Sequence, residues 1–311
     1  MLSVSLLGGF RVLYDNILIT ELNTPRLQSL LTFLLLHKDA PQSRAHLAFI
    51  FWPDTSESQA RTNLRNILHH LRHALPNAET YLCVDIHTIY WRADAPFSLD
   101  VDNFESAILQ AEKALRIHNT KAGLEALGRA TTFYQGDLLP SCYDEWIIPH
   151  REALRQENLT ALERLVRLLE EQHEFSAAIQ FAQRILQHDP LHESTYRDLI
   201  RLHAINGDRA SALRAYHTCT TVLQRELDVM PSPATTQAYE NLMGAMGIPA
   251  PTSLVRISIF PLVGREVEWA QMLQVWREKT LIREPHALII SGEAGIGKSR
   301  LLDDFIQWAA R

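Results

Sequence analysis

The first part of the chain mixes short apolar runs with turn residues, which distinguishes it from everything that follows. Over residues 2–19, apolar and β-branched positions are interrupted at Gly8 and Gly9 and again at Asp15 and Asn16. Glycine pairs and Asp-Asn steps are typical of tight turns between strands. The pattern therefore predicts short antiparallel strands at the start of the chain.

Helical periodicity replaces this pattern after residue 24. Apolar residues recur at three- and four-residue spacing over Pro25–His37, Ser43–Phe51 and Glu57–Leu75. Two strand-like runs then meet near Asp85–His87 and predict a hairpin within residues 80–92. Strands, three helices and a closing hairpin are the plan of a winged helix-turn-helix, which we expect over residues 1–95.

Residues 100–247 are predicted to be almost wholly helical and internally repeated. A shift of 34 residues places Leu165 on Leu199 and Ala178 on Ala212. This period is that of tetratricopeptide repeats, helical hairpins that stack on their neighbours. An unrelated helical bundle with accidental alanine spacing remains the alternative. The predicted helix breaks are Asn119, Gly136, His173, Pro190, Gly207 and Pro231, and a degenerate first repeat is expected over Phe104–Tyr134.

A proline-containing linker over residues 248–262 precedes a third segment, residues 263–311. There the apolar run HALII leads into GEAGIGKS and then into an amphipathic helical stretch. This order matches a P-loop, in which a strand precedes and a helix follows the glycine-rich turn. The overall prediction is a mainly α chain: an α+β winged helix, a TPR-like α-solenoid and a truncated α/β P-loop segment.

The P-loop residues predict that the complete P-loop domain of a longer parent protein binds ATP with Mg²⁺. Gly292, Gly295 and Gly297 let backbone N–H groups close around phosphates, where the following helix N-terminus adds a positive dipole end. Lys298 would reach the β- and γ-phosphates, and Ser299 would ligate Mg²⁺. A surface glycine turn with a lysine is the alternative interpretation.

We expect this segment to be a fragment of an NTPase domain, with weak or no ATPase activity in this chain. A Walker B acid needs a further strand, and Asp303 and Asp304 lie on the P-loop helix itself. Any ATPase activity is therefore expected only in a longer parent protein. No Ser/His/Asp or Cys/His arrangement suggests another catalytic site.

Charge and cysteine content limit the possible functions. The net charge of −6 gives no overall basic surface, so any contact with nucleic acid must come from a local patch. The three cysteines have no metal-ligand spacing and suit a reducing compartment. No apolar run reaches membrane-spanning length, and the N-terminus lacks a signal-peptide pattern, so we expect a cytoplasmic protein without membrane partners.

The predicted helix Glu57–Leu75 has a narrow apolar stripe and an opposite face of hydrogen-bonding and cationic side chains. Arginine can form two hydrogen bonds to guanine and asparagine can do the same to adenine, as major-groove reading requires. A merely solvated amphipathic helix is the alternative. The stripe consists of Ala60, Leu64, Ile67, Leu68, Leu71 and Leu75, and the predicted DNA-binding residues are Arg61, Thr62, Arg65, Asn66, His69, Arg72 and His73, with Arg44. Lys38 and His46 are expected to add backbone contacts.

Several longer stretches resemble a known family of regulators. LGGFRV, PRLQSLLTFLLLHKDAPQSRAHLAFIFWPD and ARTNLRNILHHLRHAL are similar to the OmpR-type winged helix at the front of antibiotic-regulatory-protein (SARP) regulators. FYQGDLLP, Trp146 with Arg151, and RELDVMPSPATTQAYENL resemble the bacterial transcriptional activator domain that follows it. LVGREVEWAQM resembles the opening of STAND-class signalling ATPases. One departure is that the Glu57–Leu75 helix has histidines where many relatives have arginines.

The resemblance implies a regulator that binds repeated promoter sites on double-stranded DNA and recruits RNA polymerase. It also implies homodimerisation or polymerase contact through the helical repeats, and nucleotide control in a full-length parent. The alternative is an ATP-dependent signalling switch whose repeats bind protein partners without specific DNA binding. Exposure or burial of the outer face of residues 61–73 discriminates between the two.

Overall fold

The computed structural model describes residues 1–245, 266–280, 301–302 and 305, which fall into two compact units, Met1–Leu242 and Met243–Arg311. In the second unit, helix α12 (Glu266–Thr280) contributes Met272 to a small apolar cluster with Leu301 and Phe305. The predicted linker and the P-loop residues lie outside the described part of the chain.

Two small sheets frame the N-terminal region of the first unit. Strands β1 (Leu2–Ser5), β2 (Arg11–Tyr14), β3 (Ile17–Leu18) and β7 (Phe97–Leu99) form one sheet in the order β3-β2-β1-β7. Strands β1, β2 and β3 are antiparallel, as predicted, and the β2–β3 turn uses Asp15 and Asn16 at positive φ. Strand β7 was not predicted, and it pairs with β1 in parallel.

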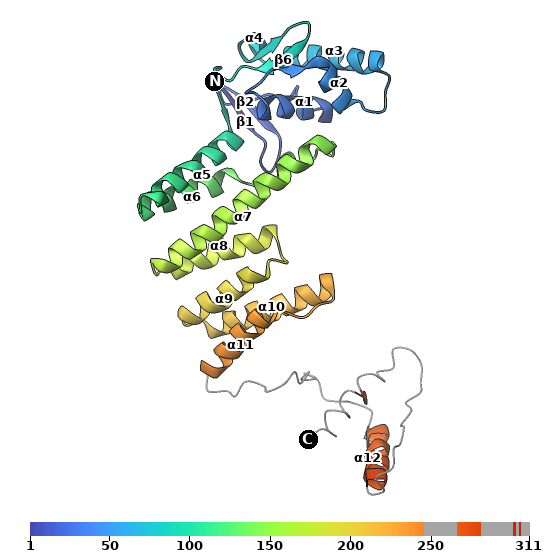
Figure 1. Cartoon of the computed structure of the whole chain (residues 1–311), viewed down its shortest axis with the longest axis vertical. Helices are drawn as coiled ribbons and strands as arrows, with labels where there is room; N and C mark the ends of the chain where they lie inside the picture. Colours follow the sequence, from blue (N-terminus) through green and yellow to red (C-terminus); the bar gives the residue numbers. More distant parts are fainter. Residues whose placement is uncertain (246–265, 281–300, 303–304, 306–311) are drawn as a thin grey trace. The chain divides into compact units, whose positions relative to one another are not determined.

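Three helices follow the first strands, as the hydrophobic pattern predicted. They are α1 (Pro25–Leu36), α2 (Arg44–Phe51) and α3 (Glu57–Ala74), and the short α4 (Ala78–Tyr81) follows them. The second sheet has the order β4-β6-β5, with β4 (Gln42–Ser43), β5 (Leu82–Val84) and β6 (Thr88–Trp91). The antiparallel pair β5–β6 is the predicted hairpin. These elements form the winged helix-turn-helix (Figure 1).

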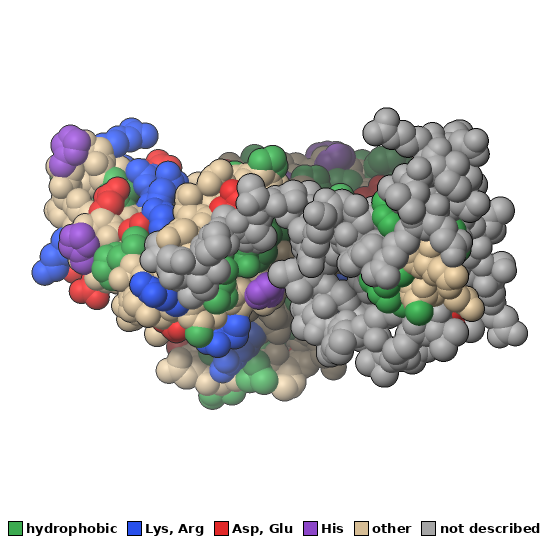
Figure 2. All heavy atoms as spheres, turned by 90° about the horizontal axis from the view of Figure 1, so that it is seen from below, with side chains coloured by type: hydrophobic (Ala, Val, Ile, Leu, Met, Phe, Trp, Pro, Cys, Tyr) green, Lys and Arg blue, Asp and Glu red, His purple; other side chains and the backbone are tan. Residues whose placement is uncertain are grey.

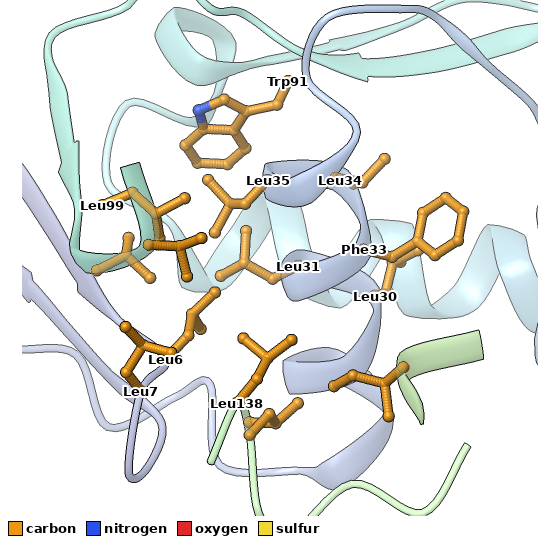
Figure 3. Close-up of a cluster of buried hydrophobic side chains, with 14 of the residues drawn as sticks. Leu6, Leu7, Leu30, Leu31, Phe33, Leu34, Leu35, Trp91, Leu99 and Leu138 are labelled. Atoms are coloured by element: carbon orange, nitrogen blue, oxygen red, sulfur yellow. The ribbon is translucent and has the colours of Figure 1, made fainter. Parts of the chain in front are cut away.

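The core of the winged helix is built around α1. Because α1 is apolar on nearly all sides, it packs against both the strands and the other helices. Figure 3 shows Leu31 and Leu35 of α1 directed toward Trp91 and Leu99, which come from β6 and β7. Trp91 is fully buried, whereas Trp52 and Trp146 are half-buried at the edge of the same core.

Helical hairpins make up the rest of the first unit and lie one beside the next in Figure 1. The helices are α5 (Asp100–Arg116), α6 (Thr120–Phe133), α7 (Ile148–Glu171), α8 (Phe175–His188), α9 (Glu193–Ile205), α10 (Arg209–Leu227) and α11 (Pro233–Ala245), with a 3-10 turn over Glu145–Ile147. The 34-residue shift relates equivalent buried positions, since Leu165, Leu199, Ala178 and Ala212 are all buried. The predicted TPR-like arrangement is therefore confirmed.

The winged helix shares one continuous hydrophobic core with α5, α6 and the first part of α7. Leu138, from the segment between α6 and α7, lies in the same cluster as Leu6, Leu7 and Leu31 (Figure 3). The backbone pairs as well, because Leu139 N–H donates to Leu6 O at 2.8 Å and Gly8 N–H donates to Asp137 O at 2.9 Å. We call this contact between residues 6–8 and 137–139 the seam.

Candidate nucleic-acid interface

Helix α3 is positioned by its apolar stripe. Its N-cap is Ser56, whose hydroxyl accepts a hydrogen bond from Gln59 N–H at 3.4 Å. The six stripe positions predicted from the sequence are all buried: Ala60, Leu64, Ile67, Leu68, Leu71 and Leu75. This packing against α1 and α2 fixes which side of α3 faces outward.

The outward side of α3 presents every helix residue that the sequence analysis selected for DNA contact. Arg61, Thr62, Arg65, Asn66, His69, Arg72 and His73 are all exposed. The helical hairpins of the same unit do not cover them, so the face is open to a partner. Their role in DNA binding remains a prediction, because exposure permits contact without demonstrating it.

The arginines on this face differ in their electrostatic surroundings. Arg61 pairs with Glu57 one turn earlier, and Arg72 lies 3.4 Å from Glu79 of α4. Within the described residues, Arg65 forms no ion pair. Exposed pairs of this kind are weak, so phosphate groups can displace their carboxylates. Glu79 was not predicted to lie here, and it approaches α3 because the chain reverses at Asn77 in the left-handed conformation.

A groove of about 600 Å³ runs between α3 and the β5–β6 hairpin. Three arginines line it, against one carboxylate, that of Glu79. It thereby brings together side chains from α2, α3 and the α3–α4 turn, namely Arg44, Arg65, His69, Arg72, His73 and Asn77. When a helix contacts bases in the major groove, a cationic groove beside that helix can bind the phosphate backbone of one DNA strand.

The hairpin turn is held by its own carboxylate. Asp85 accepts hydrogen bonds from the N–H groups of His87 at 2.7 Å and Thr88 at 2.6 Å, and from the Thr88 hydroxyl at 2.7 Å. The Thr88 side-chain bond, followed by the backbone bonds, lowers the pKa of Asp85. The turn therefore keeps Asp85 ionised and internally engaged, and it leaves Ile86 84% exposed at the tip.

Arg44 joins the hairpin to the N-terminus of α2. Its guanidinium donates to the Asp85 carbonyl at 2.9 Å, and its N–H donates to the His87 carbonyl at 2.9 Å. The predicted residue Arg44 therefore lies in the groove and also fixes the hairpin relative to α2. His46, another predicted contact, is exposed on α2.

The opposite flank of α3 has a second groove, of about 680 Å³, with a different character. Asn63, Asn66 and His70 line it above apolar side chains such as Trp52. Its one arginine, Arg26, is bonded to Asp144 at 2.9 Å. The cationic groove therefore lies on the hairpin side of α3 only.

Lys38, another residue expected to contact the DNA backbone, has a partner within the protein. Lys38 lies 2.6 Å from Asp102 of α5 in an ion pair that is largely shielded, with 20% of the lysine side chain exposed. This pair ties the end of α1 to the helical hairpins and takes Lys38 away from the α3 surface. No local pattern predicts this pair, because the partners are 64 residues apart.

The face shown in Figure 2 carries its Lys and Arg side chains in small separate groups among acidic and uncharged residues. This distribution agrees with the net charge of −6. Among the residues that the structure describes, no cluster of three metal-ligating side chains occurs, and no helix is both long and apolar enough to cross a bilayer.

The helical region matches a known family. The family model of the bacterial transcriptional activator domain covers residues 99–243, which begin at the end of β7 and run through α5 to α11. Residues 99–243 are therefore similar to a bacterial transcriptional activator domain, and we refer to this similar region as the activator domain.

A curated relative and a solved structure extend the similarity of the activator domain into the winged helix. The transcriptional regulatory protein MoaR1 of Mycobacterium tuberculosis (strain ATCC 25618 / H37Rv) is 22% identical over 231 residues, which are 71% of this chain and 73% of MoaR1. The structure of Mycobacterium tuberculosis EmbR in complex with a low affinity phosphopeptide aligns with a TM-score of 0.63 and 19% identity, over 78% of this chain. At this identity EmbR shows the fold alone, and the aligned part spans 65% of the EmbR chain.

The motif residues of the activator domain build the seam. Within FYQGDLLP, Asp137, Leu138 and Leu139 provide the contacts to residues 6–8. Arg151 of α7 holds this segment, because its guanidinium donates to the carbonyls of Leu138 at 2.9 Å, Leu139 at 2.8 Å and Cys142 at 2.9 Å. The winged helix thus packs against the FYQGDLLP segment of the activator domain.

A buried hydroxyl adds a polar contact between the activator domain and α1. Ser29 of α1 is 1% exposed and donates to the Asp144 carboxylate at 2.5 Å. Trp146 Nε1 donates to the same hydroxyl at 3.3 Å. Because buried polar groups need partners, this network favours one orientation of the activator domain on α1.

Proposed function

We propose that this chain is a DNA-binding transcriptional regulator of the SARP type. The observation that carries the proposal is the exposed polar and cationic face of α3, which borders a groove with three arginines on the hairpin side. The activator domain and the similarity to the transcriptional regulatory protein MoaR1 support it.

In the proposed complex, α3 enters the major groove of double-stranded DNA. Arg65 and Asn66 are exposed in the middle of the helix, and both side chains can form two hydrogen bonds to a base edge. Arg44 and Arg72, in the groove beside the hairpin, contact phosphates of one strand. The hairpin tip then touches backbone or minor groove.

The activator domain completes the proposed regulator. Its stacked helical hairpins offer surfaces for a second copy of the chain or for RNA polymerase, as helical repeats do for proteins in general. We propose a cytoplasmic homodimer on repeated promoter sites that activates transcription.

The test is fluorescence anisotropy with labelled duplexes from the protein's own upstream region, at two salt concentrations. We expect specific binding that weakens steeply with salt. Arg65→Ala or Asn66→Ala should cost about 1–3 kcal/mol in binding free energy if the residue reads a base. Arg116→Ala is the matched control, since this arginine is exposed on α5, away from α3. Binding by the α3 variants that equals wild type would refute the proposed recognition face.

We further propose that the third segment binds ATP with Mg²⁺ through GEAGIGKS. The sequence motif supports this, with Gly292, Gly295, Gly297, Lys298 and Ser299 in the roles given above. Titration of a fluorescent ATP analogue with Mg²⁺ tests it. Lys298→Ala should weaken binding about tenfold or more, whereas Lys121→Ala on α6 should not, and equal binding by both variants would refute the site.

A further inference from the structure

Three histidines form a short row along the outer side of α3. The rings of His69 and His73 are 4.3 Å apart between centroids, and those of His69 and His70 are 5.8 Å apart. All three side chains are exposed. His69 and His73 border the cationic groove, and His70 and His73 border the second groove on the other flank.

The permanent charges around this row nearly cancel. On α3 itself, Arg61 is offset by Glu57, and Arg72 is offset by Glu79 from α4. From the other flank, Glu21 and Arg26 face the row across the second groove, and Arg26 is offset by Asp144.

Two permanent cations remain without a carboxylate partner among the described residues that border the row, Arg44 and Arg65. None of the three imidazoles has a carboxylate within ion-pair distance in the described part of the chain. The number of positive charges offered to DNA therefore depends on how many of the imidazoles carry a proton.

We propose that DNA binding by this chain takes up protons on His69 and His73, so that two imidazolium groups contact phosphates and affinity rises as pH falls. The proposal rests on the proposed function and names the chemical form in which the histidines bind. Three observations support the proposal. The two rings lie close together, both are exposed, and few cations without a carboxylate partner lie beside them.

The direction of the pH effect follows from charge. In the free protein, the two imidazoles have ring centroids 4.3 Å apart and little negative charge beside them. A phosphate strand in the groove supplies that negative charge. The complex then holds more protons than the free protein does between pH 8 and pH 6, where imidazoles change charge, and linkage requires tighter binding at the lower pH.

The experiment measures anisotropy of a duplex carrying a pH-insensitive dye at pH 8 and pH 6, each over a series of salt concentrations. For wild type we expect affinity about 5- to 40-fold tighter at pH 6, and a salt dependence of log K steeper by about 1–2, since each added phosphate contact contributes about 0.9. The double variant His69→Gln/His73→Gln should lose both effects and bind like wild type at pH 8 within about threefold.

His118→Asn is the matched control. His118 is exposed between α5 and α6 at a φ of 57°, a conformation that asparagine tolerates. This variant should keep the full pH dependence.

Specific binding by wild type that does not change between pH 8 and pH 6 overturns the proposal and leaves the proposed function intact. Persistence of the pH effect in the double variant overturns the proposal as well, because protonation elsewhere would then be responsible. Failure to bind any duplex at either pH overturns the proposal together with the proposed function.

Discussion

Gly8 offers a direct test of how the seam contributes to stability. It has a φ of +90°, and its N–H donates to the Asp137 carbonyl at 2.9 Å. A methyl group at this position would lie 3.0 Å from the Gln135 carbonyl carbon, 3.1 Å from its Cβ and 3.2 Å from its oxygen. Gly8→Ala therefore combines backbone strain with a clash against main-chain atoms that cannot rotate away.

The backbone strain and the clash together determine how much Gly8→Ala should lower the free energy of unfolding. A non-glycine residue held at positive φ costs about 1–3 kcal/mol, and a shift of the 135–137 backbone weakens the Gly8–Asp137 hydrogen bond, worth about 1 kcal/mol. We expect Gly8→Ala to lower the free energy of unfolding by about 2–4 kcal/mol. In a unit of this size, each kcal/mol lowers Tm by about 2–4 °C.

Gly9→Ala is the matched control, because an added Cβ at Gly9 meets no atom within 4 Å and the residue has no positive φ. It should change the free energy of unfolding by less than about 1 kcal/mol. Urea unfolding followed by circular dichroism measures both variants. If Gly8→Ala is as stable as wild type, or if both variants lose the same stability, the prediction that Gly8→Ala strains the seam is refuted.

Three further outcomes are expected. Arg151→Lys should lower the free energy of unfolding by about 1–3 kcal/mol in urea unfolding, because one ammonium group cannot replace a fork that bonds three carbonyls; unchanged stability would contradict this. Leu71→Ala, at a fully buried stripe position, should cost about 2–5 kcal/mol in the same assay, and a loss below 1 kcal/mol would argue against the packing of α3. Burial lowers the pKa of His150, His188 and His203, so the unfolded chain binds more protons than the folded chain does below about pH 6.5. Stability should therefore fall as the pH drops below about 6.5. A Tm that rises from pH 6.5 to pH 5.5 would contradict this.

Much of the winged helix could be predicted because its signals are local. The stripe from Ala60 to Leu75 follows the 3.6-residue period of one helix, so the buried and exposed sides of α3 were correct residue by residue. The turn at Asp15 and Asn16 was likewise recognisable, because both residue types tolerate positive φ.

Other features depend on partners far apart in the chain. Strand β7 has three residues, and its parallel pairing with β1 joins positions 95 residues apart, which no local pattern reveals. Asp102 similarly acquires its role only when folding brings it to Lys38, 64 residues earlier in the chain. The ion pair of Lys38 could not be predicted for this reason, and its contact with DNA stays a prediction.

The nucleotide-binding residues remain a prediction from the motif alone, because Gly292–Ser299 lie outside the described residues. The same holds for the DNA contacts of α3, where the structure gives position and exposure. Both predictions depend on side-chain chemistry that a fold comparison does not measure, so binding experiments decide them.

The continuity of the core across the seam has a mechanical consequence. Leu6, Leu7 and Leu138 belong to one packed cluster, and a peptide hydrogen bond at Leu139 bridges the two parts without an intervening hinge. Closely packed interiors resist compression and transmit displacement. Helices α5, α6 and the start of α7, which share this cluster, therefore move together with the winged helix, so a force that a bound protein applies to them would displace α3 as well.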